Sequence, residues 1–139
     1  MRILAVDWGE RRIGLAVSDP GGVIASALPT LTVKGREDAV AGVSRVAAEQ
    51  EVERIVVGLP LLMSGARGRA AVTAEAFAAL LADRTGLEVD TYDERLTSAL
   101  SQRRMHETGM KPGRAKERVD QGAAMALLES YLQSRARRG

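Results

Sequence analysis

Three acidic positions in this sequence lie where the side chains of an α/β protein converge on ligands. Asp7 ends an apolar run near the start of the chain, and Asp93 and Glu94 end a later one. Asp120 lies three residues before Ala123, at the margin of an apolar helical stripe. Ligand sites in open α/β sheets lie beyond the carboxyl ends of the strands. Clustered carboxylates repel one another, and Mg²⁺ or Mn²⁺ suits a shell of carboxylates and water. The pattern therefore predicts a divalent-metal site.

Each acid also has an ordinary structural interpretation. Asp7 could cap the turn that follows its strand. Either acid after the later strand could pair with Arg95, and Asp120 could pair with Lys116 one helical turn away. Surface ion pairs of this kind contribute little stability. The residues alone leave both interpretations open.

The composition restricts the chemistry of such a site. The chain of 139 residues has no cysteine and one histidine, His106. Thiolate and multi-histidine zinc sites are therefore excluded, and any metal must be held mainly by oxygen. The length fits a single domain, residues 1–139. The apolar run before Asp7 is too short for a signal peptide or a membrane span, so we expect a cytoplasmic protein with no membrane partner.

The elements that must position these acids follow from hydrophobic periodicity. The expected order is βββαβαβαα, in which the first three strands form an antiparallel meander and the later strands pair in parallel. This order predicts an α/β fold with a mixed sheet and helices on both faces. Pro29 should place the third strand at a sheet edge or a bulge. The expected strands are Arg2–Val6, Arg12–Val17, Val23–Val33, Glu53–Val57 and Leu87–Tyr92; the expected helices are Arg36–Gln50, Arg69–Thr85 (capped by Gly86), Thr97–Glu107 and Ala115–Arg137.

Basic residues are concentrated in the last third of the chain. Residues 1–92 carry 10 Lys and Arg against 12 acids, a balance of −2, whereas residues 93–139 carry 10 against 6, a balance of +4. The last third could therefore bind an anionic partner, although a solvated helix surface gives the same pattern. The candidate contacts for an anionic partner, which the family resemblance given below implies to be nucleic acid, are Arg11, Arg12, Arg95, Arg103, Arg104, Lys111, Arg114, Lys116 and Arg118.

Two further features have a binding and a structural interpretation. Trp8 could stack on a base or pack in the core. The Leu59–Gly68 loop, which holds a proline and two glycines, could present backbone amides to a phosphate.

Four blocks occur in order across nearly the whole chain. They are Asp7-x-Gly9-x-x-Arg12-Ile13-Gly14-x-Ala16; Gly58-Leu59-Pro60 with Met63, Gly65 and Gly68; Asp93-Glu94-Arg95-Leu96-Thr97-Ser98; and Lys116, Asp120 and Ala123-Ala124 ahead of Leu127 and Tyr131-Leu132. Together they resemble the YqgF/RuvX family, whose members are described as pre-16S rRNA nucleases and as Holliday-junction-resolvase-like proteins.

The resemblance implies an RNase H-like fold, with a five-stranded sheet of three antiparallel strands followed by two parallel ones. It also implies that Asp7, Glu94 and Asp120 are catalytic and hold two Mg²⁺ or Mn²⁺ ions, with Asp93 as the alternate to Glu94. Such a site hydrolyses phosphodiester bonds with two ions about 4 Å apart. His106 then has no catalytic role.

The implied activity is nucleolytic, and the implied substrate is nucleic acid. One candidate is the 5′ end of pre-16S rRNA, with the ribosome as a partner. The alternatives are structured DNA, for a Holliday-junction resolvase or a DNA-repair nuclease, and a non-catalytic nucleic-acid-binding or transcription factor. An actin-like ATPase would need a second domain, for which this chain is too short. A resolvase would need a homodimer for paired cuts, whereas an rRNA nuclease could act as a monomer.

Overall fold

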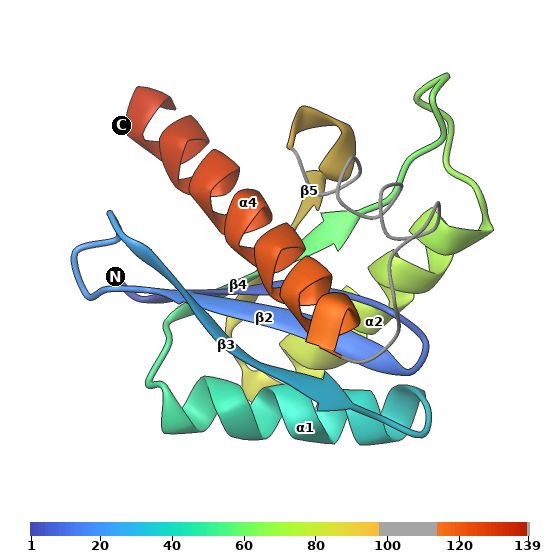
Figure 1. The fold of residues 1–139 in the computed structure, drawn as a ribbon, viewed down its shortest axis with the longest axis horizontal. Helices are drawn as coiled ribbons and strands as arrows, with labels where there is room; N and C mark the ends of the chain where they lie inside the picture. The colour runs from blue at the N-terminus through green and yellow to red at the C-terminus, as the bar shows by residue number, and fades with distance from the viewer. Residues whose placement is uncertain (98–113, 139) are drawn as a thin grey trace.

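The computed structural model describes residues 1–97 and 114–138 and forms one five-stranded sheet with helices on both faces (Figure 1). The strands are β1 (Ile3–Asp7), β2 (Arg12–Ser18), β3 (Ala25–Thr32), β4 (Arg54–Leu59) and β5 (Glu88–Asp93). The helices are α1 (Arg36–Glu49), α2 (Arg69–Thr85), the 3₁₀ helix η1 (Glu94–Leu96) and α4 (Arg114–Arg138).

The strand order β3-β2-β1-β4-β5 places β1 in the centre of the sheet. β1 pairs antiparallel with β2, and β2 pairs antiparallel with β3. β4 pairs parallel with β1, and β5 pairs parallel with β4. The carboxyl ends of β1, β4 and β5 therefore lie together, and we call this side of the sheet the carboxyl edge.

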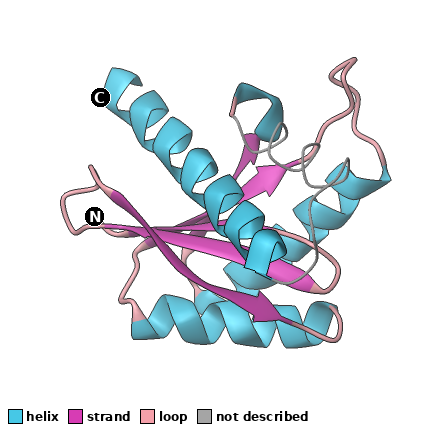
Figure 2. Ribbon diagram, viewed as in Figure 1, coloured by secondary structure: helices cyan, strands magenta, loops and turns pink. Residues whose placement is uncertain are grey.

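Two hydrophobic cores lie on the two faces of the sheet, because side chains alternate along each strand. Leu4 and Val6 of β1 belong to the core that includes Phe77 of α2 and residues of α1. Ile3 and Ala5 belong to the other core, which α4 covers (Figure 2). Burial of a large apolar side chain contributes about 1.5–3 kcal/mol, which explains why β1 is buried along its whole length. Asp7 continues the alternation of Ile3 and Ala5, so it belongs to the face of the sheet that α4 covers, which we call the α4 face.

The predicted architecture is confirmed for the described residues. The first three strands form the antiparallel meander, the later strands are parallel, and α2 has the predicted bounds. Its C-cap Gly86 adopts a left-handed conformation (φ 72°), which glycine tolerates better than other residues. β3 is an edge strand whose register with β2 shifts between Ile13 and Leu15, as Pro29 predicts.

Three features differ from the prediction or lie outside the described residues. β3 is shorter than the expected strand, because the residues up to Ile24 belong to a turn that Asp19 holds through the backbone amides of Val23 and Ile24. The 3₁₀ helix η1 was not predicted. Apart from Thr97, the helix expected at 97–107 lies outside the described residues. Within the described part of the chain, no helix is both long and apolar enough to cross a membrane.

Candidate active site

Asp7 is the last residue of β1 and is buried at the carboxyl edge, with 3% of its surface exposed. It pairs with Gly14 of β2. Because its neighbours Ile3 and Ala5 pack against α4, the Asp7 side chain belongs to the same face of the sheet. A carboxylate buried this deeply costs free energy unless charge or hydrogen bonds compensate for the lost solvation.

Glu94 is the first residue of η1, immediately after β5, and is 1% exposed. Its carboxyl group lies over Gly58 of β4: a Cβ placed on Gly58 would meet Glu94 Oε1 at 2.6 Å and Cδ at 3.2 Å. Val56 packs in the core on the α4 face. Side chains alternate along a strand, so a side chain at position 58, two residues later, would point to the same face. The Glu94 carboxylate therefore occupies the space above Gly58 on that face.

Asp7 and Glu94 thus belong to the same face of the sheet, from strands on either side of β4. Val6 pairs with Val57, so Asp7 lies level with Gly58, the residue over which Glu94 lies. The absence of a side chain at position 58 gives the two acids access to a common space. In the sequence Gly58 is one element of a motif, and its role beside Glu94 is not predictable from that motif because it depends on strand order.

Asp93 has a different environment from that of its neighbour Glu94. Its carboxylate accepts bonds from Arg95 Nη2 at 2.8 Å and Nε at 3.1 Å, and from the Arg95 backbone amide at 2.9 Å. The side-chain bond from Arg95 holds the pKa of Asp93 below its ordinary value, and the same bond raises the pKa of Arg95. The structural interpretation of an acid paired with Arg95 is therefore correct for Asp93.

Arg95 also connects η1 to the loop that follows β4. Its Nη1 donates to the Met63 carbonyl at 3.4 Å, and Gly65 lies beside the guanidinium in a left-handed conformation (φ 90°). The amide of Leu62 bonds to the Ala66 carbonyl, and the amide of Gly65 bonds to the Leu62 carbonyl. These two amides stabilise the loop itself, which weakens the interpretation of the loop as a cradle for phosphate.

Asp120 is placed only through its backbone, which lies in α4. The next residue, Gln121, donates from Nε2 to the Leu28 carbonyl at 3.1 Å. Leu28 pairs with Leu15, and Leu15 pairs with Val6, so this part of α4 crosses the sheet near the carboxyl end of β1. Asp120 precedes the buried residues Ala123 and Ala124 by one turn, so its Cα lies on the sheet-facing side of the helix.

The remaining predicted residues are only partly covered by the structure. The side chains of Arg114, Lys116 and Arg118 belong to the part of α4 where only the backbone is described. Arg103, Arg104, Lys111 and His106 lie outside the described residues. Among the side chains that the structure describes, no three potential metal ligands come together. The side chain of Asp120 is not among those described.

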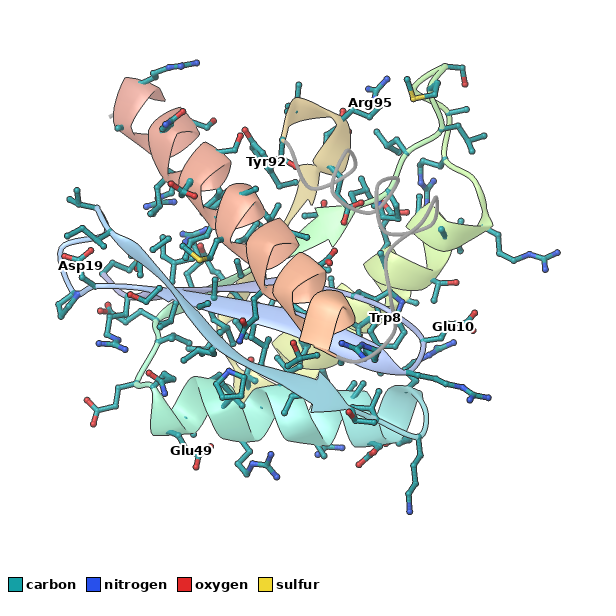
Figure 3. All side chains as sticks on the ribbon, in the orientation of Figure 1. Trp8, Glu10, Asp19, Glu49, Tyr92 and Arg95 are labelled. Atoms are coloured by element: carbon teal, nitrogen blue, oxygen red, sulfur yellow. The ribbon has the colours of Figure 1, made fainter. Side chains whose placement is uncertain are left out.

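Trp8 stacks on Phe77 of α2, with ring centroids 4.3 Å apart and an interplanar angle of 24°. Figure 3 shows Trp8 and Glu10 at the turn between β1 and β2, at the opposite end of the hairpin from Asp19. The packing interpretation of Trp8 is therefore the one that the structure supports. Arg11 is exposed and Arg12 half-buried in the same region, close along the chain to Asp7.

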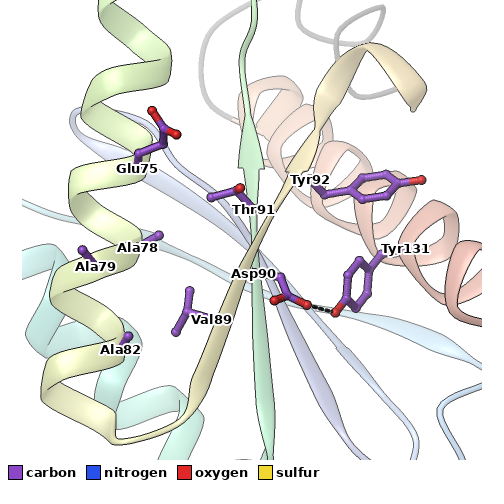
Figure 4. Close-up of a pocket in the computed structure, with 9 residues that line it drawn as sticks. All are labelled: Glu75, Ala78, Ala79, Ala82, Val89, Asp90, Thr91, Tyr92 and Tyr131. Atoms are coloured by element: carbon purple, nitrogen blue, oxygen red, sulfur yellow. Dashed lines mark hydrogen bonds between the residues drawn. The ribbon is translucent and has the colours of Figure 1, made fainter. Parts of the chain in front are cut away.

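A pocket beside the edge strand β5, between α2 and α4, is lined by none of the predicted site residues (Figure 4). Its Asp90 accepts a short hydrogen bond from the Tyr131 hydroxyl and pairs with Arg54 at 2.9 Å. Burial, together with the bond to Asp90, raises the pKa of Tyr131. The polar groups here bind each other, so we assign the network a structural role.

The order of strands and the position of the helices define an RNase H-like fold. The chain is similar to "T. thermophilus RuvC in complex with Holliday junction substrate" (TM-score 0.60, 18% identity, 98% of this chain and 96% of that chain). It is also similar to the Fowlpox virus resolvase in a Holliday junction DNA complex (TM-score 0.59, 12% identity, 96% and 98% covered). At these identities the likeness concerns the fold.

The family follows from the sequence itself. The family model described as "RuvX: Holliday junction resolvase" matches residues 1–134, and this chain belongs to that family. A relative from Chloroflexus aurantiacus, named "Putative pre-16S rRNA nuclease", is 43% identical over 133 residues, covering 96% of this chain and 87% of its own length. A second relative of that name, from Acetivibrio thermocellus, is 39% identical and is covered over 99% of both chains. The resemblance of the four sequence blocks is therefore confirmed.

Proposed function

We propose that this protein is a metal-dependent nuclease that cleaves phosphodiester bonds and processes the 5′ end of pre-16S rRNA. The observation that carries the proposal is the pair of buried acids, Asp7 and Glu94, on one face of the sheet at the carboxyl edge. The family supports nuclease activity, and the names of the relatives support the rRNA substrate.

The residues present fit a divalent cation. The two acids offer only oxygen donors, and the Glu94 carboxylate is held in a space that a Cβ on Gly58 would fill. We propose that Asp7, Glu94 and Asp120 hold Mg²⁺ or Mn²⁺, as the family resemblance implies. When bound, the metal would neutralise clustered negative charge and activate water for attack on phosphorus.

The protein itself positions these acids and the substrate. β1 positions Asp7. The Asp93–Arg95 pair holds the start of η1, and Gly58 leaves room for the Glu94 carboxylate. Arg11 and Arg12, at the end of the turn that follows Asp7, would hold phosphates that flank the cleaved bond. Such contacts increase affinity and make binding sensitive to salt, but they do not read the sequence.

The test uses a labelled transcript that contains the precursor extension and the 5′ region of mature 16S rRNA. The controls are a scrambled transcript of equal length and a four-way DNA junction, each with Mg²⁺, Mn²⁺ or EDTA. We expect metal-dependent cleavage of the precursor, no cleavage with EDTA, and loss of cleavage in Asp7→Asn, which removes charge but keeps size. Absence of cleavage of every substrate under every metal would contradict the nuclease proposal.

Resolution of Holliday junctions is the second candidate, because the matching family model carries that description. Paired, symmetric cuts in a four-way junction need two active sites, hence a homodimer. Symmetric cleavage of the junction by a dimer, measured together with the molar mass by light scattering, would favour this function over rRNA processing. Cleavage of the precursor transcript alone would favour the first.

A further inference from the structure

Three exposed cations lie beside the turn that follows Asp7: Arg11, Lys34 and Arg36. We call this group the α1 rim. The amide of Val33 donates to the carbonyl of Arg11 at 2.8 Å, which places Lys34 directly beside the β1–β2 turn. Arg36 is the first residue of α1. None of the three sits in the basic last third of the sequence, and only Arg11 was predicted to contact nucleic acid.

The cations of the α1 rim differ from most other cations whose side chains are described. Five arginines form ion pairs: Arg45 with Glu49, Arg54 with Glu88 and Asp90, Arg67 with Glu75, Arg84 with Glu37, and Arg95 with Asp93. In the described part of the chain, the three rim cations make no ion pair and no side-chain hydrogen bond. Arg69, which begins α2, and Arg137, near the end of α4, share this property.

The acids near the rim neutralise it only in part. Glu37 is 3.7 Å from Arg84, and the Asp38 carboxylate accepts the backbone amide of Lys34 at 2.9 Å. Glu10 is exposed at the tip of the turn (Figure 3). The amino end of α1 adds partial positive charge, because its first amides have no partners within the helix. Glu37 lies against Arg84, but Asp38 keeps its charge, so the three cations face Glu10 and Asp38 with a balance of +1, and such a surface attracts polyanions weakly.

The rim and the acids both lie at the carboxyl edge, but on opposite faces of the sheet. Asp7 belongs to the α4 face, whereas α1 packs on the opposite face. Thr32 pairs with Arg12, so β3 ends at the same edge at which β1 ends, and α1 begins there. The rim therefore lies within reach of a nucleic-acid strand that enters at Asp7 on the α4 side and continues past the β1–β2 turn.

We propose that the α1 rim is a second phosphate-binding surface, which holds the nucleic-acid strand on the far side of the β1–β2 turn from the acids. This inference rests on the proposed nuclease function and adds to it the path of the flanking strand. The rim binds phosphates and does not read bases, so it acts on RNA and DNA alike. It complements the basic residues expected between Arg103 and Arg118.

The test compares Lys34→Gln/Arg36→Gln with the wild type and with Arg45→Gln. Arg45 is an exposed arginine on the same helix, but it pairs with Glu49 and lies outside the rim. Binding to labelled single-stranded RNA and to a four-way DNA junction is measured by fluorescence anisotropy in EDTA, which prevents cleavage, between 50 and about 200 mM salt. Thermal unfolding of each variant verifies that it is folded.

For single-stranded RNA, loss of two phosphate contacts should reduce the slope of log K against log salt by about 1.4 and weaken binding on the order of tenfold near 0.1 M salt. Arg45→Gln should leave the slope unchanged. A reduced slope with RNA, DNA or both supports the rim and shows which nucleic acid it holds. An unchanged slope with both, while the wild type binds, overturns the rim and leaves the nuclease proposal intact. Absence of binding by the wild type contradicts both.

Discussion

Gly58→Ala changes the one position that the structure identifies as the space for the Glu94 carboxylate. The added Cβ would lie 2.6 Å from Glu94 Oε1, whereas ordinary contacts begin at 3.4 Å, so the carboxylate must move by about 0.8 Å. Glu94 is 1% exposed, and its Cγ would also lie 3.0 Å from the new Cβ, so the whole side chain and not only its end must shift. Gly58 does not have a positive φ, so the conflict is steric.

The expected cost has two parts. Overpacking a buried site by one methyl group costs about 1–3 kcal/mol of the free energy of unfolding. Displacement of a catalytic group by roughly 1 Å lowers the rate on the order of a hundredfold. We therefore expect Gly58→Ala to remain folded, with a moderately lower melting temperature, and to lose cleavage activity far more than its loss of stability would explain.

The assay measures thermal unfolding and metal-dependent cleavage of the precursor transcript on the same preparations. The matched control is Gly42→Ala in α1, where the new methyl would meet only the flexible end of Leu31 at 3.2 Å. It should keep full activity and gain about 0.5–1 kcal/mol from helix propensity. Wild-type cleavage by Gly58→Ala would refute the assignment of Glu94 to the site, because its carboxylate would then tolerate displacement.

Two further predictions concern the groups around the site. Tyr131→Phe removes the hydroxyl that donates to Asp90. The free energy of unfolding should fall by only about 1 kcal/mol, because Asp90 keeps its bond to Arg54. An unchanged denaturation midpoint would show that the bond between Tyr131 and Asp90 does not stabilise the fold. Arg95 lowers the pKa of Asp93 below its ordinary value of 3.8, so the pair stabilises the fold above that pH and loses its contribution as the pH falls through the lowered value. The difference in stability between wild type and Asp93→Asn should therefore be constant from neutral pH down to about 5 and shrink below about 4; a difference that grows on acidification would contradict the pairing.

Local patterns in the sequence predicted most of the fold. The apolar run before Asp7 gave the central strand, and the glycines at 68 and 86 delimit α2 because each breaks the helical pattern. The alternation of later strands and helices required parallel pairing, since a crossover connection returns the chain to the same edge. These signals lie within a few residues of the elements that they specify.

The site was less predictable, because it depends on contacts between distant segments. Asp93 and Glu94 are adjacent, and the choice between them depends on which one continues the α4 face of β5 and on where Arg95 lies. The role of Gly58 requires that β4 lie between β1 and β5. Charge counted along the chain pointed to the last third and missed Lys34 and Arg36, which reach the carboxyl edge only through the pairing of β3 with β2.

Whether Glu94 and Asp7 hold a metal together is best measured by titrating wild type, Glu94→Gln and Asp93→Asn with Mn²⁺ and following the titration by electron paramagnetic resonance. Both variants replace a carboxylate by an isosteric amide in adjacent residues, but only Glu94 shares the α4 face with Asp7. We expect Glu94→Gln to weaken Mn²⁺ binding by at least about tenfold, whereas Asp93→Asn should leave it near the wild-type value. Weakening by Asp93→Asn alone, or equal binding by all three proteins, would contradict this expectation.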